Sequence, residues 1–333
     1  MYSIKLERNI FNKIIYISGP TASGKSFAST YLGIRWPIEI VNIDSTLVYK
    51  CMNIGTSKPK KEEKRIIKHH LIDIRDPSQV YSLSDFFYDV NIVINQIIKK
   101  KKIPLLVGGT IMYYKFFNKN LFDNRKKDIK LRFQIIIKIK QKGLKKLYYW
   151  LCKLDANISL FVSFSDKNRI RRSIEICILS GYKLSDFYET GEFNNLGTKE
   201  YHEKDLPLKE TNYKIISLEP SNRIDLYIKI EKRLDLMLKN GLINEIKKLK
   251  RRNDLHKNLP SINSIGYKQY WNYLDGIISY KEAKNNSIVL TKNLVKNQLI
   301  LLQRFNKRKI IDCSDIKFKK KLLDTFYIDL EYN

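Results

Sequence analysis

The chain contains few cysteines, and their spacing gives them no structural role. Its four cysteines, at positions 51, 152, 177 and 313, lie far apart and form no CxxC pair. A disulfide framework and a zinc site both need paired cysteines at characteristic spacings. The composition therefore predicts a protein of the reducing cytoplasm.

Long apolar runs are lacking as well. Charged residues make up 29% of the 333 residues and hydrophobic residues 43%, and no run approaches the length of a membrane span. The first residues, MYSIKLERNI, lack the apolar core of a signal peptide. We therefore expect a soluble globular protein with no membrane partner, long enough for more than one domain.

Acidic residues are scarce relative to basic ones. There are 63 Lys and Arg residues against 34 Asp and Glu, which gives a net charge of +29. Such an excess predicts a polyanionic partner, RNA or DNA. An AT-rich genome, whose codons favour Lys, Ile, Asn and Tyr, would explain the same excess without any function, and charge alone does not separate the two.

What the sequence does contain is a phosphate-binding loop (P-loop). Residues 19–26 read GPTASGKS, which matches the pattern GxxxxGK[ST] found in ATP-binding and other nucleotide-binding proteins. An apolar stretch at 13–18 predicts a buried parallel strand before it, and a helix is expected from Lys25 to about Leu32. In this context the backbone N–H groups face an anion, Lys25 contacts the terminal phosphate and the Ser26 hydroxyl ligates Mg²⁺.

The order of the expected elements predicts an α/β fold with a P-loop parallel sheet flanked by helices and an all-helical insertion domain. We expect residues 1–123 to form the first part of the core, 124–205 the helical insertion and 206–333 the remainder of the core with the C-terminal helices. Expected strands are 38–43, 69–74, 103–110 and 213–220. Expected helices are 82–102, with Ser82 or Ser84 as N-cap, 222–251, and a final helix at about 283–305.

Further stretches, taken together, resemble the bacterial tRNA dimethylallyltransferases (tRNA isopentenyltransferases). They are DSTLVYKCMNIGTSKP from residue 44, HHLIDIRDP from 69, PLLVGGT from 104, SIGYKQ from 264 and TKNLVKNQ from 291. The resemblance covers nearly the whole chain, in order. It implies transfer of a dimethylallyl group from dimethylallyl diphosphate to the exocyclic amine of the adenine 3′ of the tRNA anticodon. The P-loop then holds a prenyl diphosphate, an apolar tail replaces the nucleoside, and we expect a monomer.

The resemblance also implies roles for individual residues. Asp44, at a strand end near the P-loop, accepts the amine proton, because an adenine amine is a poor nucleophile that needs a base. Thr110 lies at the bridging oxygen of the diphosphate. The residues expected to bind the diphosphate are Gly19, Pro20, Thr21, Ala22, Ser23, Gly24, Lys25, Ser26 and Arg233.

The residues expected to contact the anticodon stem-loop lie in separate segments. Basic side chains would meet phosphates, and aromatic or Arg surfaces would carry splayed bases. The set comprises Asp44, Ser45, Thr46 and Leu47; Thr110 and Arg132; Asn168, Arg169, Ile170, Arg171 and Arg172; Asn263, Ser264, Ile265, Gly266, Tyr267 and Lys268; and Thr291, Lys292, Asn293, Leu294, Val295, Lys296, Asn297 and Gln298.

The chain departs from the family pattern at several of these positions. The usual TRQLAKRQ reads TKNLVKNQ, the usual QR dipeptide reads Asn168-Arg169, and MDIGTAKP reads MNIGTSKP with Asn53 in place of an acid. Lys lacks the planar fork of Arg and Asn carries no charge, so these changes bear on tRNA affinity. The zinc finger of the eukaryotic members is absent.

Plainer interpretations stand beside these. Asp44 and Thr110 could each cap a turn or helix after a strand, and the basic segments could be solvated helix faces. His69 and His70 point to opposite faces of a strand and make a poor metal-ligand pair. The rival functions are a P-loop small-molecule kinase and a non-catalytic RNA-binding P-loop protein. A GTPase is disfavoured because the N-K-x-D guanine signature is absent.

Overall fold

The computed structural model describes residues 11, 13–110, 129–181, 183–186, 213–305 and 308–331. The chain divides into two compact units, which we treat separately. The larger unit comprises residues 1–115 and 206–333, and the helical unit comprises 116–205. The domain boundaries expected near residues 123 and 205 lie outside the described residues.

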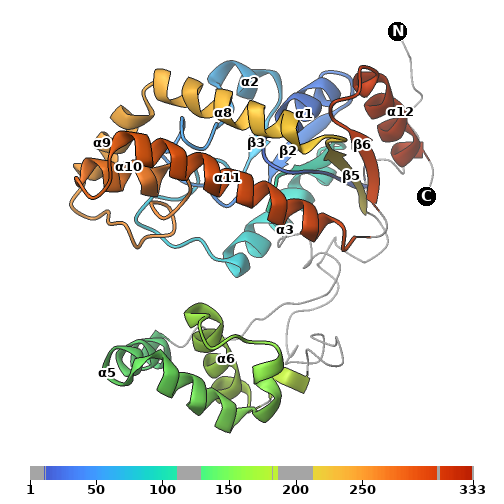
Figure 1. Ribbon diagram of the computed structural model, residues 1–333. Coiled ribbons are helices and arrows are strands. Elements are labelled where there is room, and N and C mark those ends of the chain that lie inside the picture. The colour runs from blue at the N-terminus through green and yellow to red at the C-terminus, as the bar shows by residue number, and fades with distance from the viewer. Residues whose placement is uncertain are drawn as a thin grey trace. The chain divides into compact units, whose positions relative to one another are not determined.

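A six-stranded parallel sheet forms the centre of the larger unit (Figure 1). Its strand order is β3-β2-β4-β1-β5-β6, and every neighbouring pair is parallel. This confirms the α/β class that the alternating pattern predicts. The strands are β1 (Ile14–Ser18), β2 (Ile38–Asn42), β3 (His69–His70), β4 (Ile103–Val107), β5 (Tyr213–Glu219) and β6 (Arg308–Asp312).

Two strand predictions need correction. The strand expected at 69–74 is only two residues long, because Leu71 and Asp73 adopt positive φ angles of 58° and 59°, which an extended strand does not allow. The helix expected to be final is followed by β6 and another helix, so the sheet gains an edge strand that the prediction lacks.

Helices cover both faces of the sheet. On one face, Leu32 of α1 and Phe326 of α12 pack with Ile15 and Ile17 of β1 in one buried core, and Trp36 packs on Phe326 with ring centroids 4.9 Å apart. On the other face, α3 packs on β2 and β4. The helices here are α1 (Lys25–Gly33), α2 (Lys61–Ile66), α3 (Leu83–Lys99, with Ser82 as N-cap) and α12 (Phe318–Glu331).

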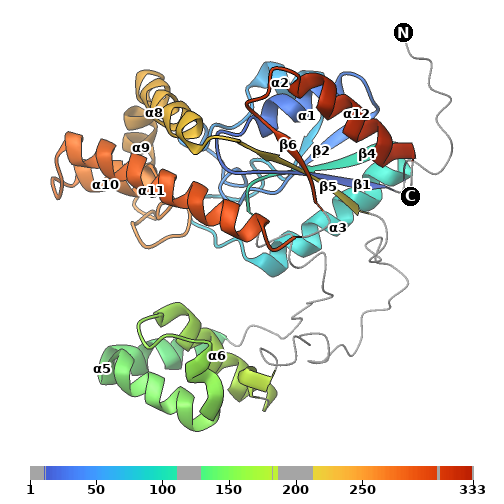
Figure 2. The same ribbon diagram turned by 45° about the vertical axis from the view of Figure 1, so that its right-hand side comes forward.

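A second group of helices lies beside the sheet (Figure 2). It consists of α8 (Arg223–Lys239), α9 (Leu242–Lys250), α10 (Tyr267–Leu274) and α11 (Tyr280–Leu302). The single helix expected at 222–251 is two helices, because Gly241 takes a left-handed conformation with φ of 97° between them. Glycine adopts that conformation without the strain that a side chain causes.

The helical unit has its own small core. Leu151 of α5 (Ile129–Leu154), Ile158 of the 3₁₀ helix η2 (Ala156–Leu160) and Ile170 of α6 (Lys167–Ser180) are fully buried in it. Gly143, with φ of 77°, interrupts α5. The described residues of this unit contain helices and no strand, as expected for the insertion. Across the described part of the chain, no helix is long and apolar enough to cross a bilayer.

Candidate active site

The loop between β1 and α1 has the backbone conformation that a phosphate cradle requires. Gly19 and Gly24 have φ angles of 145° and 87°, and Ala22 has a φ of 65°. A Cβ at Gly19 would lie 2.5 Å from the Leu218 carbonyl oxygen, so no larger residue fits there. The buried Ser23 hydroxyl has no hydrogen-bond partner among the described residues. The first N–H groups of α1 have no partner within the helix and can hold an anion.

Lys25 lies over this loop. Its Nζ donates to the carbonyl oxygens of Gly19, at 2.9 Å, and Pro20, at 2.6 Å. Burial lowers the pKa of Lys25 to about 8, while the carboxylate of Asp44 opposes that shift and the guanidinium of Arg233 adds to it. Lys25 is therefore close to the charged groups of the site and carries a proton that it holds less firmly than an exposed lysine.

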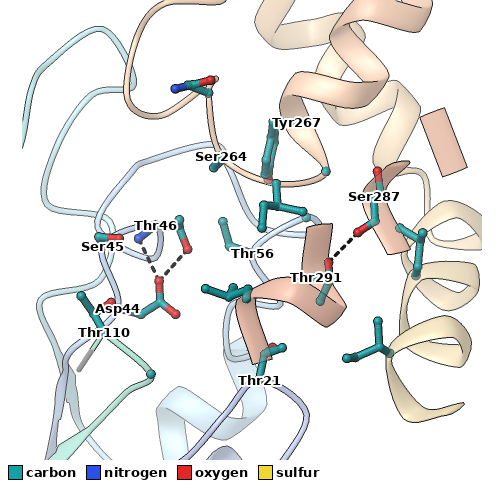
Figure 3. Close-up of a pocket in the computed structure, with 18 of the residues that line it drawn as sticks. Thr21, Asp44, Ser45, Thr46, Thr56, Thr110, Ser264, Tyr267, Ser287 and Thr291 are labelled. Atoms are coloured by element: carbon teal, nitrogen blue, oxygen red, sulfur yellow. Dashed lines mark hydrogen bonds between the residues drawn. The ribbon is translucent and has the colours of Figure 1, made fainter. Parts of the chain in front are cut away.

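Asp44 follows β2 and presents one free carboxylate oxygen. Its Oδ1 accepts hydrogen bonds from the Thr46 N–H at 2.9 Å and the Thr46 hydroxyl at 2.7 Å. No group in the described residues donates to Oδ2, and Figure 3 shows the carboxylate held from one side by Thr46. The arrangement fixes the side chain and leaves an oxygen open to accept a proton.

Thr110 reaches the same place from the end of β4, and a glycine makes this possible. A Cβ at Gly108 would lie 2.0 Å from the Ile43 carbonyl oxygen, so the two strand ends approach this closely only with glycine there. The Thr110 N–H donates to that same oxygen at 3.4 Å. As a result Thr110 lies beside Asp44 (Figure 3).

A pocket of about 550 Å³ opens at these strand ends, a size typical of small-molecule sites. One wall is polar, with Thr21, Asp44, Thr46, Thr110 and Arg233. Another part is apolar and comes from α8, α9 and α11. Its residues are Ile230, Leu234, Met237, Leu242, Ile288, Leu294 and Leu301.

Arg233 joins α8 to the P-loop. Its Nε donates to the Ser57 hydroxyl at 2.9 Å, and an NH group donates to the Thr21 hydroxyl at 3.0 Å. Burial lowers the pKa of Arg233, and the charge of Asp44 counteracts this. A half-buried guanidinium beside the P-loop is suited to receive an anion.

Glu245 on α9 supports the pocket and was not predicted from the sequence. Its carboxylate accepts from the backbone N–H groups of residues 53–55 at 2.9 to 3.3 Å, and from the Tyr267 hydroxyl at 2.5 Å. A Cβ at Gly55 would lie 2.5 Å from the Tyr267 ring, so this glycine makes room for the ring. Asn53 contributes a backbone N–H, which any residue other than proline supplies, so the Asn in place of the usual acid leaves this contact intact. Because these contacts span about 190 residues of sequence, no local pattern marks Glu245.

Two segments expected to contact tRNA meet at this pocket. Residues 263–267 line it, whereas Lys268 is exposed outside the lining. Ser45 and Thr46 line it as well, but Leu47 does not. The Tyr267 hydroxyl is engaged by Glu245 and its ring is fully buried, so it is held as part of the wall.

The segment 291–298 on α11 divides by the face of the helix. Thr291, Leu294, Asn297 and Gln298 line the pocket, and Val295 is fully buried. Lys292 pairs with Glu231 of α8 at 2.7 Å, whereas Asn293 and Lys296 are exposed.

The segment 168–172 lies at the start of α6 in the helical unit. Asn168 and Arg169 are exposed, but Ile170 is fully buried in the core of that unit. Arg171 and Arg172 lie 3.9 Å and 3.2 Å from the buried carboxylate of Glu175. Arg132 lies on α5, and its side chain is outside the described residues.

The donors present fit a magnesium ion that is shared with a substrate. No group of three His, Cys, Asp or Glu side chains gathers as a ligand set in the described part of the chain. The exposed Ser26 at the start of α1 could supply one oxygen ligand beside the cradle. Mg²⁺ commonly keeps several waters and takes its other ligands from substrate phosphates, so one protein hydroxyl is consistent with such a site.

Comparison with known proteins identifies the family. A family model described as IPP transferase matches residues 47–305. The chain belongs to the IPP transferase family. A tRNA dimethylallyltransferase of Bordetella avium is 41% identical over 300 residues, which cover 90% of this chain and 92% of that protein.

Solved structures agree with this membership of the IPP transferase family. The full-length tRNA isopentenylpyrophosphate transferase from Bacillus halodurans is 31% identical with a TM-score of 0.67, over 96% of this chain and 97% of that one. A eukaryotic dimethylallyltransferase acting on tRNA has a TM-score of 0.76 over 95% of this chain and 77% of that one, at 23% identity. The last likeness concerns the fold alone.

Proposed function

We propose that the protein is a tRNA dimethylallyltransferase, which moves a dimethylallyl group from dimethylallyl diphosphate to the exocyclic N6 amine of the adenine 3′ of the anticodon and releases diphosphate. The observation that carries this proposal is the pocket itself. Around one space lie an open carboxylate oxygen of Asp44, the Thr110 side chain, and Arg233 of α8 where it contacts Thr21 of the P-loop. The apolar residues of α8 and α11 complete it, where a nucleotide-binding site would need groups that read a base or ribose.

The diphosphate binds at the P-loop. The free N–H groups at the start of α1, the ammonium of Lys25 and the guanidinium of Arg233 supply donors and positive charge. Lys25 Nζ, which donates to the carbonyl oxygens of the loop, lies where it can also donate to the phosphate oxygens. Ser26 would hold Mg²⁺ together with the diphosphate, and the ion, when bound, would supply positive charge to the leaving group.

The reaction forms one bond and breaks another. The N6 nitrogen attacks the allylic carbon, the carbon–oxygen bond to the diphosphate breaks, and the amine proton passes to the Oδ2 oxygen of Asp44. The Thr110 hydroxyl donates to the bridging oxygen as it gains negative charge, and Lys25 and Arg233 stabilise the departing diphosphate. Thr46 keeps the Asp44 carboxylate in place throughout.

The acceptor is a polyanion, which the net charge of +29 suits. The adenine has to leave the stacked anticodon loop to reach Asp44, as in other enzymes that modify bases. Residues 263–267, together with the pocket-lining Thr291 and Asn297 of α11, contact the loop nucleotides around it. The enzyme acts as a monomer in the cytoplasm, the compartment of its tRNA substrate.

Isotope transfer from labelled dimethylallyl diphosphate to tRNA, run beside an ATP-hydrolysis assay, tests the proposal. We expect transfer to tRNA and no ATP consumption, with ATP competing weakly through its phosphates. Lys25→Ala should abolish transfer, whereas Lys99→Ala, at the exposed end of α3, should leave it unchanged. Robust ATP turnover without tRNA and without prenyl transfer would establish a kinase instead.

A further inference from the structure

Gln298 makes contacts that the sequence does not suggest. It lies in the segment of α11 expected to contact tRNA, yet it is 8% exposed. Its Oε1 accepts a hydrogen bond from the Thr21 N–H of the P-loop at 2.9 Å. Its Nε2 donates to the Gly109 carbonyl oxygen, also at 2.9 Å. A single side-chain amide therefore bridges the P-loop and the turn that carries Thr110.

The two partners of the amide determine its orientation. Thr21 offers a donor and Gly109 an acceptor, so only the orientation with the oxygen toward Thr21 satisfies both. The bonds connect α11 with residues 277 and 189 positions earlier in the chain. Loss of the amide would leave a partly buried donor and a buried acceptor without partners, which destabilises that arrangement of the two loops.

Gly109 is shaped for this bridge. A Cβ at Gly109 would lie 2.6 Å from Nε2 of Gln298 and 3.5 Å from the Gly19 carbonyl oxygen. The neighbouring Gly108 is required for a different reason, its approach to Ile43. The two glycines of the GGT sequence thus serve two contacts, and the second one admits the amide between the loops.

We propose that Gln298 is a positioning residue for prenyl transfer, which holds the P-loop in register with Thr110. This inference rests on the proposed function. The bridge occupies the Thr21 N–H, so the diphosphate is held by the other amides of the loop, and it sets where the bridging oxygen lies relative to the Thr110 hydroxyl. Gln298 is on α11, which lines the pocket. The same side chain therefore also connects this helix to the P-loop.

Gln298→Met tests the proposal, since methionine has a similar length and cannot form either hydrogen bond. We expect kcat to fall about 10–100-fold, because small displacements of reacting groups have effects of this size. The affinity for tRNA, measured by filter binding in the absence of donor, should stay within about twofold, as expected for a side chain that RNA does not touch. Gln303→Met, the same change at an exposed glutamine just beyond α11, should leave kcat and tRNA affinity unchanged.

A double-mutant cycle with Gly109→Ala separates the bridge from a general loss of packing. If both residues act through the amide, the double variant should lose little more activity than the worse single variant. Additive losses would overturn the proposal. A Gln298→Met variant with weakened tRNA binding and normal kcat would overturn it as well, because that result would make Gln298 an RNA contact.

If Gln298→Met fails to fold, Gln298→Glu keeps the Thr21 bond, loses the Gly109 bond and should show the same fall in kcat with unchanged tRNA affinity. Absence of transfer by the unaltered protein would instead reject the proposed function.

Discussion

The two compact units use charged side chains in opposite ways. In the larger unit, Arg233 reaches Thr21 and Ser57, and Glu245 reaches the backbone of residues 53–55, contacts that join residues 176 to 212 positions apart. In the helical unit, Arg169 pairs with Asp166 and Arg172 with Glu175, each only three residues away. These two charges of the larger unit fix the geometry of a site, whereas these two arginines of α6 are paired with neighbours in sequence.

The difference bears on what each unit can do with a ligand. The exposed pair of Arg169 with Asp166 contributes about 0.2–0.5 kcal/mol, so a polyanion displaces it at little cost. Partly buried charges that position loops cannot be exchanged in this way, because a lost partner leaves an unsatisfied group behind. Substitutions in the larger unit should therefore alter the chemical step, and those in the helical unit should alter affinity.

The largest effect is expected at Asp44. Asp44→Asn keeps the size of the side chain and removes the proton acceptor, so turnover should fall about 10²–10⁴-fold. Binding of tRNA should fall much less. Single-turnover kinetics measure the chemical step directly, with Asp225→Asn in the first turn of α8 as the matched control. Near-normal chemistry in Asp44→Asn would remove this residue from the mechanism.

The next effect concerns the close approach of the strand ends. Gly108→Ala would force a Cβ against the Ile43 carbonyl oxygen and separate Asp44 from Thr110. We expect a loss of about 1–3 kcal/mol in the free energy of unfolding, as in overpacked interiors, together with reduced transfer. Gly33→Ala is the control, because its Cβ would meet the flexible end of the Ile67 side chain. Equal losses in urea titrations of the two variants would contradict this account.

A smaller effect should follow from the pKa of Lys25. Burial lowers this pKa to about 8, so the lysine is protonated below pH 8 and loses its charge as the pH rises above it. The value of kcat/KM for the donor should then be constant below pH 8 and fall about tenfold per pH unit above it. Lys25→Arg keeps its charge in this range, so the alkaline fall should disappear even if the overall rate is lower. An identical fall in that variant would assign the titration to another group.

The smallest effect is expected in the helical unit. Arg169→Glu should weaken tRNA binding about tenfold at low salt and reduce the slope of affinity against salt by about one, with donor KM unchanged. Arg35→Glu makes the same charge change at an exposed residue just beyond α1 of the larger unit and serves as the control. If both variants lose the same affinity for tRNA, the loss comes from the change in net charge and not from a contact of α6. That result would contradict a separate role for the helical unit in binding.

The sequence predicted the features that depend on neighbouring residues. The P-loop, the parallel sheet and the Ser82 cap follow from local patterns, and the structure contains them. The strand at 69–74 was overextended because nothing in its apolar pattern reveals the positive φ angles of Leu71 and Asp73. The contacts of Glu245 and Gln298 were not foreseen, because both depend on partners far away in the sequence.

Glu245 has one more consequence for the pocket. Three successive backbone N–H groups turned toward one point form an anion nest, of the same nature as the P-loop itself. Residues 53–55 form such a nest, and Gly55 lies on the pocket wall. Left open, these N–H groups would offer a diphosphate a second binding site at the pocket. The carboxylate of Glu245 occupies this second site. The P-loop therefore remains the place where the diphosphate of the donor binds.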